Sequence, residues 1–93
     1  MWYVYILECS DNSFYTGHTN NLSERVERHN SGRGSSHTAA RLPVKLAWYE
    51  EQKNEISATK REIQIKKWSW VKKLALIQGD IQKLKSSSKR YFC

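Results

Sequence analysis

The segment Trp2–Cys9 constrains the fold more than any other part of the chain. It is rich in Val, Ile, Tyr and Trp, and it ends at a turn-forming run of polar residues, 10–13, which is typical of a β-strand. Apolar side chains fall on both of its alternating faces. Because a strand with two apolar faces must be covered on both sides, we expect it at the centre of a sheet.

Two further strands are expected. Residues 14–18 follow the first strand after a short connection, so they predict its hairpin partner. Pro43 opens a third strand over 44–51. The residues between, 31–36, indicate a loop by their Gly and Ser content.

Two helices are expected as well. Asn21 and Asn54 are good N-cap residues, and they predict helices over 22–30 and from 55 to about 77. The second helix has an expected break near Ser69.

These elements predict a small α/β (α+β) domain over residues 1–79, with a three-stranded, mostly antiparallel sheet flanked by helices. Residues 80–93 predict a basic, partly mobile tail. The second helix carries apolar residues on two opposite sides, so we expect it to be wedged between layers. The two stripes are Ile56, Ile63 and Trp70, and Ala58, Ile65 and Trp68.

The whole chain has a net charge of +7, and its basic residues are concentrated in the second half. Residues 1–52 hold five basic and six acidic residues, whereas residues 53–93 hold eleven basic and three acidic residues. This asymmetry favours a nucleic acid or an anionic membrane surface as partner, with a merely solvated basic helix as the alternative.

The sequence predicts no membrane span. The longest apolar run, Met1–Leu7, has seven residues, against roughly 20 for a membrane helix. The N-terminus has neither the basic nor the apolar region of a secretory signal, and Cys9 and Cys93 cannot form a framework of several disulfides. We therefore expect a cytoplasmic protein with free thiols.

Two candidate functional residues share one side of the first helix. At about 100° per residue, Arg25 and His29 fall on its apolar side, whereas Arg28 falls opposite. An arginine beside a core needs an anion. For Arg25 that anion is either a structural carboxylate, Glu8 or Glu62, or a ligand. His29 is either a satisfied core histidine or a base.

Glu62 is the lone acidic residue between Glu55 and Asp80. Its simplest role is an i,i+4 ion pair with Lys66. A carboxylate in a basic stretch is also a place where a hard divalent cation could bind opposite a phosphate. The sequence contains no Cys/His metal cluster, no phosphate-cradling glycine loop and no serine nucleophile elbow.

Short motifs in a fixed order resemble one nuclease family. They are Tyr3-Val4-Tyr5, then Tyr15-Thr16-Gly17 ten residues later, then the run 21–30, then Arg61-Glu62. This combination, which covers about residues 2–78, is similar to the GIY-YIG nuclease domain, and above all to its small single-domain bacterial members.

The resemblance implies an active site made of Tyr5, Tyr15, Arg25, His29 and Glu62. In this site Tyr5 and Tyr15 are active-site phenols, and either of them could be the general base. Arg25 binds phosphate, His29 takes the polar or aromatic position one turn later, and Glu62 is the single ligand of one Mg²⁺ or Mn²⁺ ion.

Four further residues are expected to contact nucleic acid: His18, Arg41, Lys66 and Lys67. His18 matches a site where some members of the family carry lysine. Lys66 and Lys67 belong to the basic second helix.

The turn between the first two strands decides whether the two tyrosines can act together. A two-residue turn at Asp11-Asn12 would place Tyr5 and Tyr15 on opposite faces of the sheet. A shift of one residue, or a bulge, pairs Tyr5 with Gly17 and returns both phenols to one face. The implied active site therefore predicts the shifted register.

The function that the resemblance implies is a metal-dependent endonuclease that hydrolyses phosphodiester bonds in DNA, without strong sequence specificity. Branched or damaged DNA is a candidate substrate, and DNA repair a candidate process. Two alternatives stay open. One is a catalytically degenerate nucleic-acid-binding module, for which the charge asymmetry suffices; the other is a protein-interaction scaffold with a Trp-rich surface.

Overall fold

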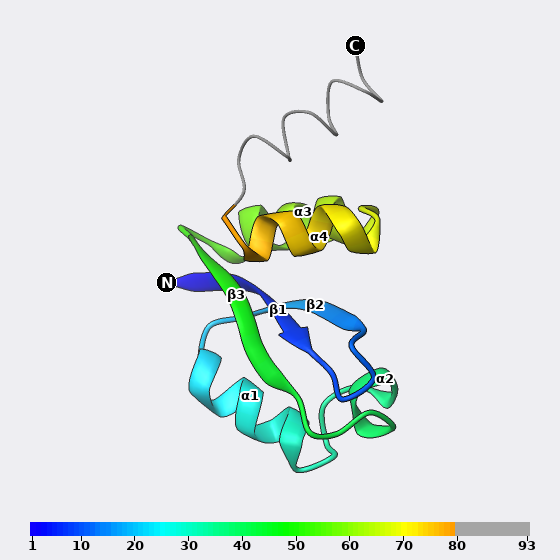
Figure 1. The fold of residues 1–93 in the computed structure, drawn as a ribbon. Helices are drawn as coiled ribbons and strands as arrows, with labels where there is room; N and C mark the ends of the chain where they lie inside the picture. Colours follow the sequence, from blue (N-terminus) through cyan, green and yellow to red (C-terminus); the bar gives the residue numbers. More distant parts are fainter. Residues whose placement is uncertain (80–93) are drawn as a thin grey trace.

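Residues 1–79 are described by the structure, a computed structural model. The elements are β1 (Trp2–Glu8), β2 (Phe14–Thr19), α1 (Leu22–Asn30), α2 (Ser36–Ala39), β3 (Lys45–Gln52), α3 (Glu55–Lys66) and α4 (Trp70–Ile77). They form three layers, with α1 and α2 on one face of the sheet and α3 and α4 on the other (Figure 1). The expected tail, 80–93, lies outside the described residues.

β1 lies at the centre of the sheet, as its two apolar faces predict. The strand order is β2-β1-β3, and both pairings are antiparallel. Val4 and Ile6 pack against Ile65 of α3 on one face, whereas Tyr5 and Leu7 join side chains of α1 on the other. The predicted fold class is therefore confirmed.

The β1–β2 hairpin has the register that the two tyrosines require. Tyr5 pairs with Gly17 and Leu7 pairs with Tyr15, so the two phenols lie on the same face of the sheet. Asn12 in the connecting turn has φ 68°, the left-handed conformation that three-residue hairpin loops use. The predicted shifted register is confirmed.

The longer helices begin and end close to the predicted residues. The side chains of Asn21 and Asn54 accept hydrogen bonds from backbone N–H groups in the first turns of α1 and α3. The break near Ser69 is confirmed, because α3 ends at Lys66 and the Ser69 side chain caps α4. No helix of residues 1–79 is long and apolar enough to cross a membrane.

One prediction about the helices is wrong and one helix was not predicted. The stretch from α3 to α4 is not wedged between layers: Ile56, Ile63 and Trp70 are 70%, 50% and 47% exposed. Only the opposite side, with Ala58 and Ile65, is buried in the core, since the described residues supply a single layer on this face of the sheet. The unpredicted helix is α2, which follows the expected loop.

Candidate active site

Tyr5 lies at the centre of the candidate site and is 1% exposed. It faces Gly17 across the β1–β2 hairpin. A Cβ atom added at Gly17 would lie 2.5 Å from the Tyr5 hydroxyl oxygen, which is too close for any side chain. Glycine at this position therefore leaves the space that the Tyr5 phenol occupies.

His29 of α1 holds the hydroxyl group of Tyr5. The Tyr5 hydroxyl oxygen lies 3.1 Å from Nε2 of His29, and Oγ1 of Thr38 lies 2.7 Å from Nδ1. Both ring nitrogens therefore have partners. Burial, together with the positive charges of Arg25 and Arg28, lowers the pKa of His29, so the imidazole is neutral at neutral pH.

The Tyr5 phenol is protonated at neutral pH. Its pKa is raised to about 12, mainly by burial and further by Tyr15 and Glu62. Arg25 lowers this pKa through its charge and a hydrogen bond, but burial outweighs it. In the free protein Tyr5 can therefore donate a proton to a neighbouring base, and it is not itself an anion.

Three arginines line a cavity beside this pair. The cavity has a volume of about 210 Å³ and is lined by Tyr15, Arg25, Arg28, His29, Arg33 and Gly34. Arg28 is exposed, as its position outside the apolar side of α1 predicts. It still lines the same cavity as Arg25, because side chains three residues apart are neighbours on a helix surface. Three guanidinium groups around one cavity make it suited to an anion such as a phosphate group.

Arg25 has no carboxylate partner among residues 1–79. Glu8 pairs with a lysine of β3, and Glu62 pairs with His18 and Lys66. The Nε atom of Arg25 is buried and has no hydrogen-bond partner within the described part of the chain. A buried donor left in this way costs about 1–3 kcal/mol, so a ligand that accepts its hydrogen would offset this cost.

Glu62 approaches the site from α3, on the other side of the sheet from α1. Its Oε1 atom lies 2.5 Å from Nδ1 of His18, and its Oε2 atom lies 2.7 Å from Nζ of Lys66. The predicted i,i+4 pair with Lys66 is thus confirmed. The Glu62 side chain is 15% exposed, so it stays within reach of a ligand from solvent.

The two halves of the site meet at β2, which is an edge strand of the sheet. Alternation along β2 places Tyr15 toward α1 and His18 toward α3. The Nζ atom of Lys66, which binds Glu62, also lies 5.9 Å from the centre of the Tyr15 ring. The site therefore wraps around β2, with phenols and arginines on one face and the carboxylate on the other.

The surroundings of Glu62 fit a loosely held divalent cation rather than a closed metal cage. Within residues 1–79, no group of three or more His, Cys, Asp or Glu residues could hold a metal ion. Mg²⁺ usually binds through one or two carboxylates and completes its shell with water and substrate phosphates. Glu62 supplies one such carboxylate, for which His18 and Lys66 now compete.

Two of the predicted nucleic-acid contacts lie outside this cluster. Arg41 donates hydrogen bonds to Oδ2 of Asp11 at 2.9 Å and to the carbonyl oxygen of His37 at 3.0 Å, so it fastens α2 to the β1–β2 turn. Lys67 caps the end of α3 and is exposed. For both residues, a contact with nucleic acid stays a prediction.

The contribution of α2 residues to the site was not predicted from the sequence. His37 stacks on Tyr15 with ring centres 6.0 Å apart, and Thr38 holds His29. Four residues are too few for a periodic pattern. The one available signal was Ser35, which forms a capping box with Thr38 three residues later; it indicates a helix start but not its contacts.

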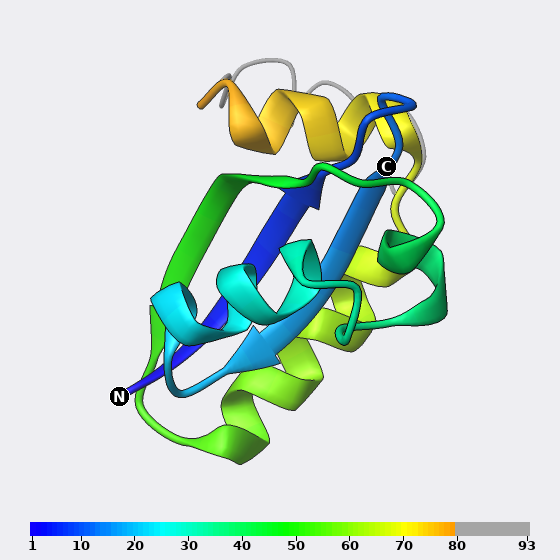
Figure 2. The same ribbon diagram turned by 90° about the horizontal axis from the view of Figure 1, so that it is seen from below.

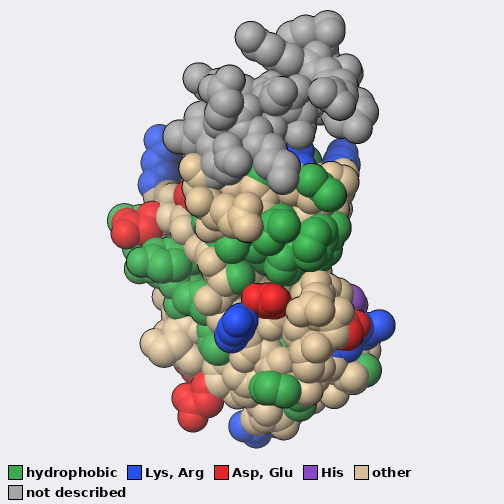
Figure 3. All heavy atoms as spheres, in the orientation of Figure 1, with side chains coloured by type: hydrophobic (Ala, Val, Ile, Leu, Met, Phe, Trp, Pro, Cys, Tyr) green, Lys and Arg blue, Asp and Glu red, His purple; other side chains and the backbone are tan. Residues whose placement is uncertain are grey.

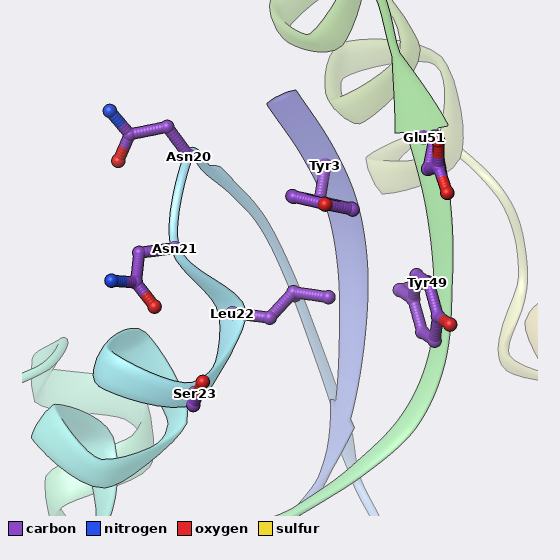
Figure 4. A pocket seen from close by; sticks show the side chains of 7 residues that line it. All are labelled: Tyr3, Asn20, Asn21, Leu22, Ser23, Tyr49 and Glu51. Carbon is purple, nitrogen blue, oxygen red and sulfur yellow. The ribbon is translucent and has the colours of Figure 1, made fainter. Parts of the chain in front are cut away.

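A second cavity, of about 300 Å³, lies at the other end of α1 and contains none of the predicted site residues. Its lining is Tyr3, Asn20, Asn21, Leu22, Ser23, Tyr49 and Glu51. The Leu22 side chain points toward β1, whereas those of Asn20 and Asn21 point away from the sheet (Figure 4). Because Glu51 is the one charged residue of this lining, the cavity is unsuited to a phosphate group.

Comparisons with known proteins identify a matching family model and several similar proteins. Residues 1–74 match the family model described as the GIY-YIG catalytic domain. The chain is 49% identical over 79 residues to a UPF0213 protein of Clostridium perfringens, with 85% of each chain covered. It is 47% identical over 83 residues to a UPF0213 protein of Syntrophus aciditrophicus, with 88% of this chain and 95% of that protein covered.

A solved structure is also similar. The solution NMR structure of a UPF0213 protein from Bacillus halodurans matches with a TM-score of 0.54 and 38% sequence identity, over 84% of each chain. These relatives are small single-domain bacterial proteins. The family model, which covers most of the chain, and the matching arrangement of strands and helices lead to one conclusion: this protein belongs to the GIY-YIG family.

Proposed function

We propose that this protein is a metal-dependent endonuclease that hydrolyses phosphodiester bonds in DNA without strong sequence specificity. The observation that carries the proposal is the buried Nε atom of Arg25, which has no hydrogen-bond partner among residues 1–79. It belongs to a cavity lined by three arginines, beside Tyr15 and His29. Membership of the GIY-YIG family supports a nuclease as the kind of enzyme.

In this function Tyr5 and His29 move a proton. The phenol oxygen of Tyr5 takes a proton from the attacking water, while its own proton passes to Nε2 of the neutral His29. This transfer requires that Nδ1 of His29 carries the ring hydrogen and donates it to Thr38. The carbonyl oxygen of Ser35, 3.2 Å from Oγ1 of Thr38, can accept the Thr38 proton, which favours this tautomer.

The arginines bind the phosphate that is attacked. Arg25 donates its unpaired N–H to a phosphate oxygen, and Arg28 and Arg33 add positive charge around the same cavity. Because Arg25 is partly buried, its charge stabilises the additional negative charge of the transition state more strongly than water does, whereas the exposed Arg28 and Arg33 contribute less.

Glu62 holds the divalent cation in this proposal. A Mg²⁺ or Mn²⁺ ion held by Glu62 would supply positive charge that stabilises the negative charge of the transition state. His18 and Lys66 fix the orientation of the Glu62 carboxylate in the free protein through contacts of 2.5 and 2.7 Å.

Nicking of supercoiled plasmid and of branched DNA by tag-free protein tests the proposal. With Mg²⁺ or Mn²⁺ present we expect nicked circles and cut branches, and with EDTA we expect none. A folded protein that binds DNA but gives no product with either metal would contradict it.

One observation favours a second function, a nucleic-acid-binding module without cleavage. Both carboxylate oxygens of Glu62 have partners, His18 and Lys66. These contacts are sufficient if Glu62 has only a structural role and binds no metal ion. The same nicking assay distinguishes the two functions, because the module would bind DNA with or without EDTA and leave it intact.

A further inference from the structure

Trp70, the first residue of α4, presents a fixed aromatic surface beside the candidate active site. Its indole stacks on Phe14, with ring centres 5.3 Å apart and planes 9° from parallel. Its Nε1 atom donates a hydrogen bond of 2.9 Å to the carbonyl oxygen of Asn12. Figure 2 shows the β1–β2 turn beside α4. One face and one edge of the indole are thus held by the hairpin.

The rest of the Trp70 side chain is open to solvent. The residue is 47% exposed, and its neighbour Val71 is 49% exposed. Figure 3 shows hydrophobic side chains gathered over the α4 side of the molecule, with Lys and Arg side chains at the margin. An exposed indole that is already oriented loses little further conformational freedom when a flat ligand stacks on it.

Trp70 is close to the active site through the strand it packs on. Phe14 and Tyr15 are adjacent in β2, and they point to opposite faces of this edge strand. A polynucleotide that follows the edge of β2 would therefore pass from the phenols and arginines on one face to the indole on the other.

Two lysines supply the positive charge that a nucleotide beside Trp70 would need. Lys73 is three residues from Trp70, so the two side chains are neighbours on the surface of α4. The Nζ atom of Lys66 lies 5.9 Å from the centre of the ring of Tyr15, which is next to Phe14 in β2. Burial, and then repulsion from the positive charge of Lys66, lower the pKa of Lys73. A phosphate group between them would relieve this repulsion.

We propose that Trp70 is a stacking site for an unpaired base of the substrate, with the adjacent phosphate bound by Lys66 and Lys73. Bases inside a duplex are covered on both faces by their neighbours, so only an unpaired, terminal or flipped base can stack on an indole. The substrate class is therefore DNA with a single-stranded segment next to the cleaved bond. The inference rests on the proposed function for its substrate.

Binding measured in EDTA, by fluorescence anisotropy of labelled oligonucleotides, tests the inference without cleavage. The probes are a thymidine strand, an abasic strand of equal length and charge, and a duplex. The variants are Trp70→Leu, Trp70→Phe and Val71→Ala, the last as a matched control for an exposed apolar residue on the same helix. Together they form a thermodynamic cycle between the indole and the base.

We expect Trp70→Leu to weaken binding of the thymidine strand by roughly tenfold, in line with the loss of one base–aromatic stack. Binding of the abasic strand and of the duplex should change less than about twofold. Trp70→Phe should keep part of the affinity, and Val71→Ala should keep all of it. For the wild-type protein, the abasic strand should bind roughly tenfold more weakly than the thymidine strand.

Equal losses on all three probes, or equal affinities of the wild-type protein for the thymidine and abasic strands, would overturn the stacking site. If Trp70→Leu does not fold, Trp70→Phe tests the indole, and equal affinities of the wild-type protein for the two strands would still overturn the site. Because no step needs cleavage, failure here with intact plasmid nicking overturns the stacking site alone. Successful stacking without nicking overturns the proposed nuclease and keeps the stacking site.

Discussion

The hydroxyl oxygen of Tyr5 lies 3.1 Å from Nε2 of His29, and the two residues are 24 positions apart in the chain. This contact joins the central strand to α1, and it buries a phenol and an imidazole together. Burial raises the pKa of Tyr5 to about 12 and lowers the pKa of His29. Both groups are therefore neutral over a wide pH range in the free protein.

The depressed pKa of His29 predicts that acid destabilises the fold. In the unfolded chain this histidine gains a proton near its ordinary value of 6.5, while the folded protein resists protonation. The unfolded state thus binds more protons below that pH, and the free energy of unfolding falls as the pH is lowered. Urea titrations between pH 8 and about pH 4 measure this change.

His29→Gln is the variant that isolates this contribution. It keeps a polar side chain but has no group that titrates in this range, so its stability should depend less on pH than that of the wild-type protein. Parallel pH profiles for the two proteins would show that other groups cause the acid sensitivity.

Tyr5 should ionise far later than an ordinary tyrosine. Its folded pKa of about 12 lies above the ordinary 10.0, so the unfolded chain loses this proton first as the pH rises. Stability should therefore decrease from about pH 10 toward pH 12. The ultraviolet absorbance of tyrosinate follows the titration directly. Tyr5→Phe should remove the ionisation step near pH 12. A Tyr5→Phe protein with an unchanged titration curve would refute the assignment.

Gly17→Ala should destabilise the fold, because its Cβ atom would lie 2.5 Å from the Tyr5 hydroxyl oxygen. The expected loss in the free energy of unfolding is about 1–3 kcal/mol, the usual range for overpacking. Denaturant melts measure it. The double variant with Tyr5→Phe removes the nearest atom, so it should recover part of the loss. No recovery would mean that the strain lies elsewhere.

Arg25→Ala should reduce cleavage without unfolding the protein. The guanidinium has no carboxylate partner within residues 1–79, so its removal breaks no ion pair seen there. The loss of one phosphate donor should slow cleavage by roughly 10²–10³-fold. Single-turnover cleavage, a thermal melt and competition by inorganic phosphate are the measurements. If Arg25→Ala instead unfolds the protein, so that phosphate binding and cleavage are lost together with the folded structure, Arg25 is a structural residue.

Most of the fold could be predicted because local rules decide it. The two apolar faces of β1 require a central position, and the caps at Asn21, Asn54 and Ser69 mark helix starts that the structure reproduces. The register of the hairpin is a different case. Local turn signals at Asp11 and Asn12 favour a two-residue turn, and the correct register followed only from the need to bring the tyrosines to one face.

The candidate site could be predicted only in part, because several of its contacts depend on long side chains and on one short helix. Arg28 falls outside the apolar stripe of α1 and is exposed, yet it lines the same cavity as Arg25. His37 and Thr38 reach the site through α2, which has no periodic pattern. The exposure of Ile63 and Trp70 depends on whether another layer covers α3 and α4, which the helix pattern alone does not reveal.

Cleavage by the Glu62→Gln variant is the most direct test of the nuclease. The substitution conserves volume and removes one carboxylate ligand of the cation, so about 4 kcal/mol of transition-state stabilisation is lost, or roughly a thousandfold in rate. Glu55→Gln is the matched control, because Glu55 is also a carboxylate of α3 near His18, at 3.7 Å, but is 61% exposed. It should cut DNA at nearly the wild-type rate. Metal-dependent nicking that is lost in Glu62→Gln and kept in Glu55→Gln, with DNA binding intact in both, is the predicted result; undiminished nicking by Glu62→Gln would contradict it.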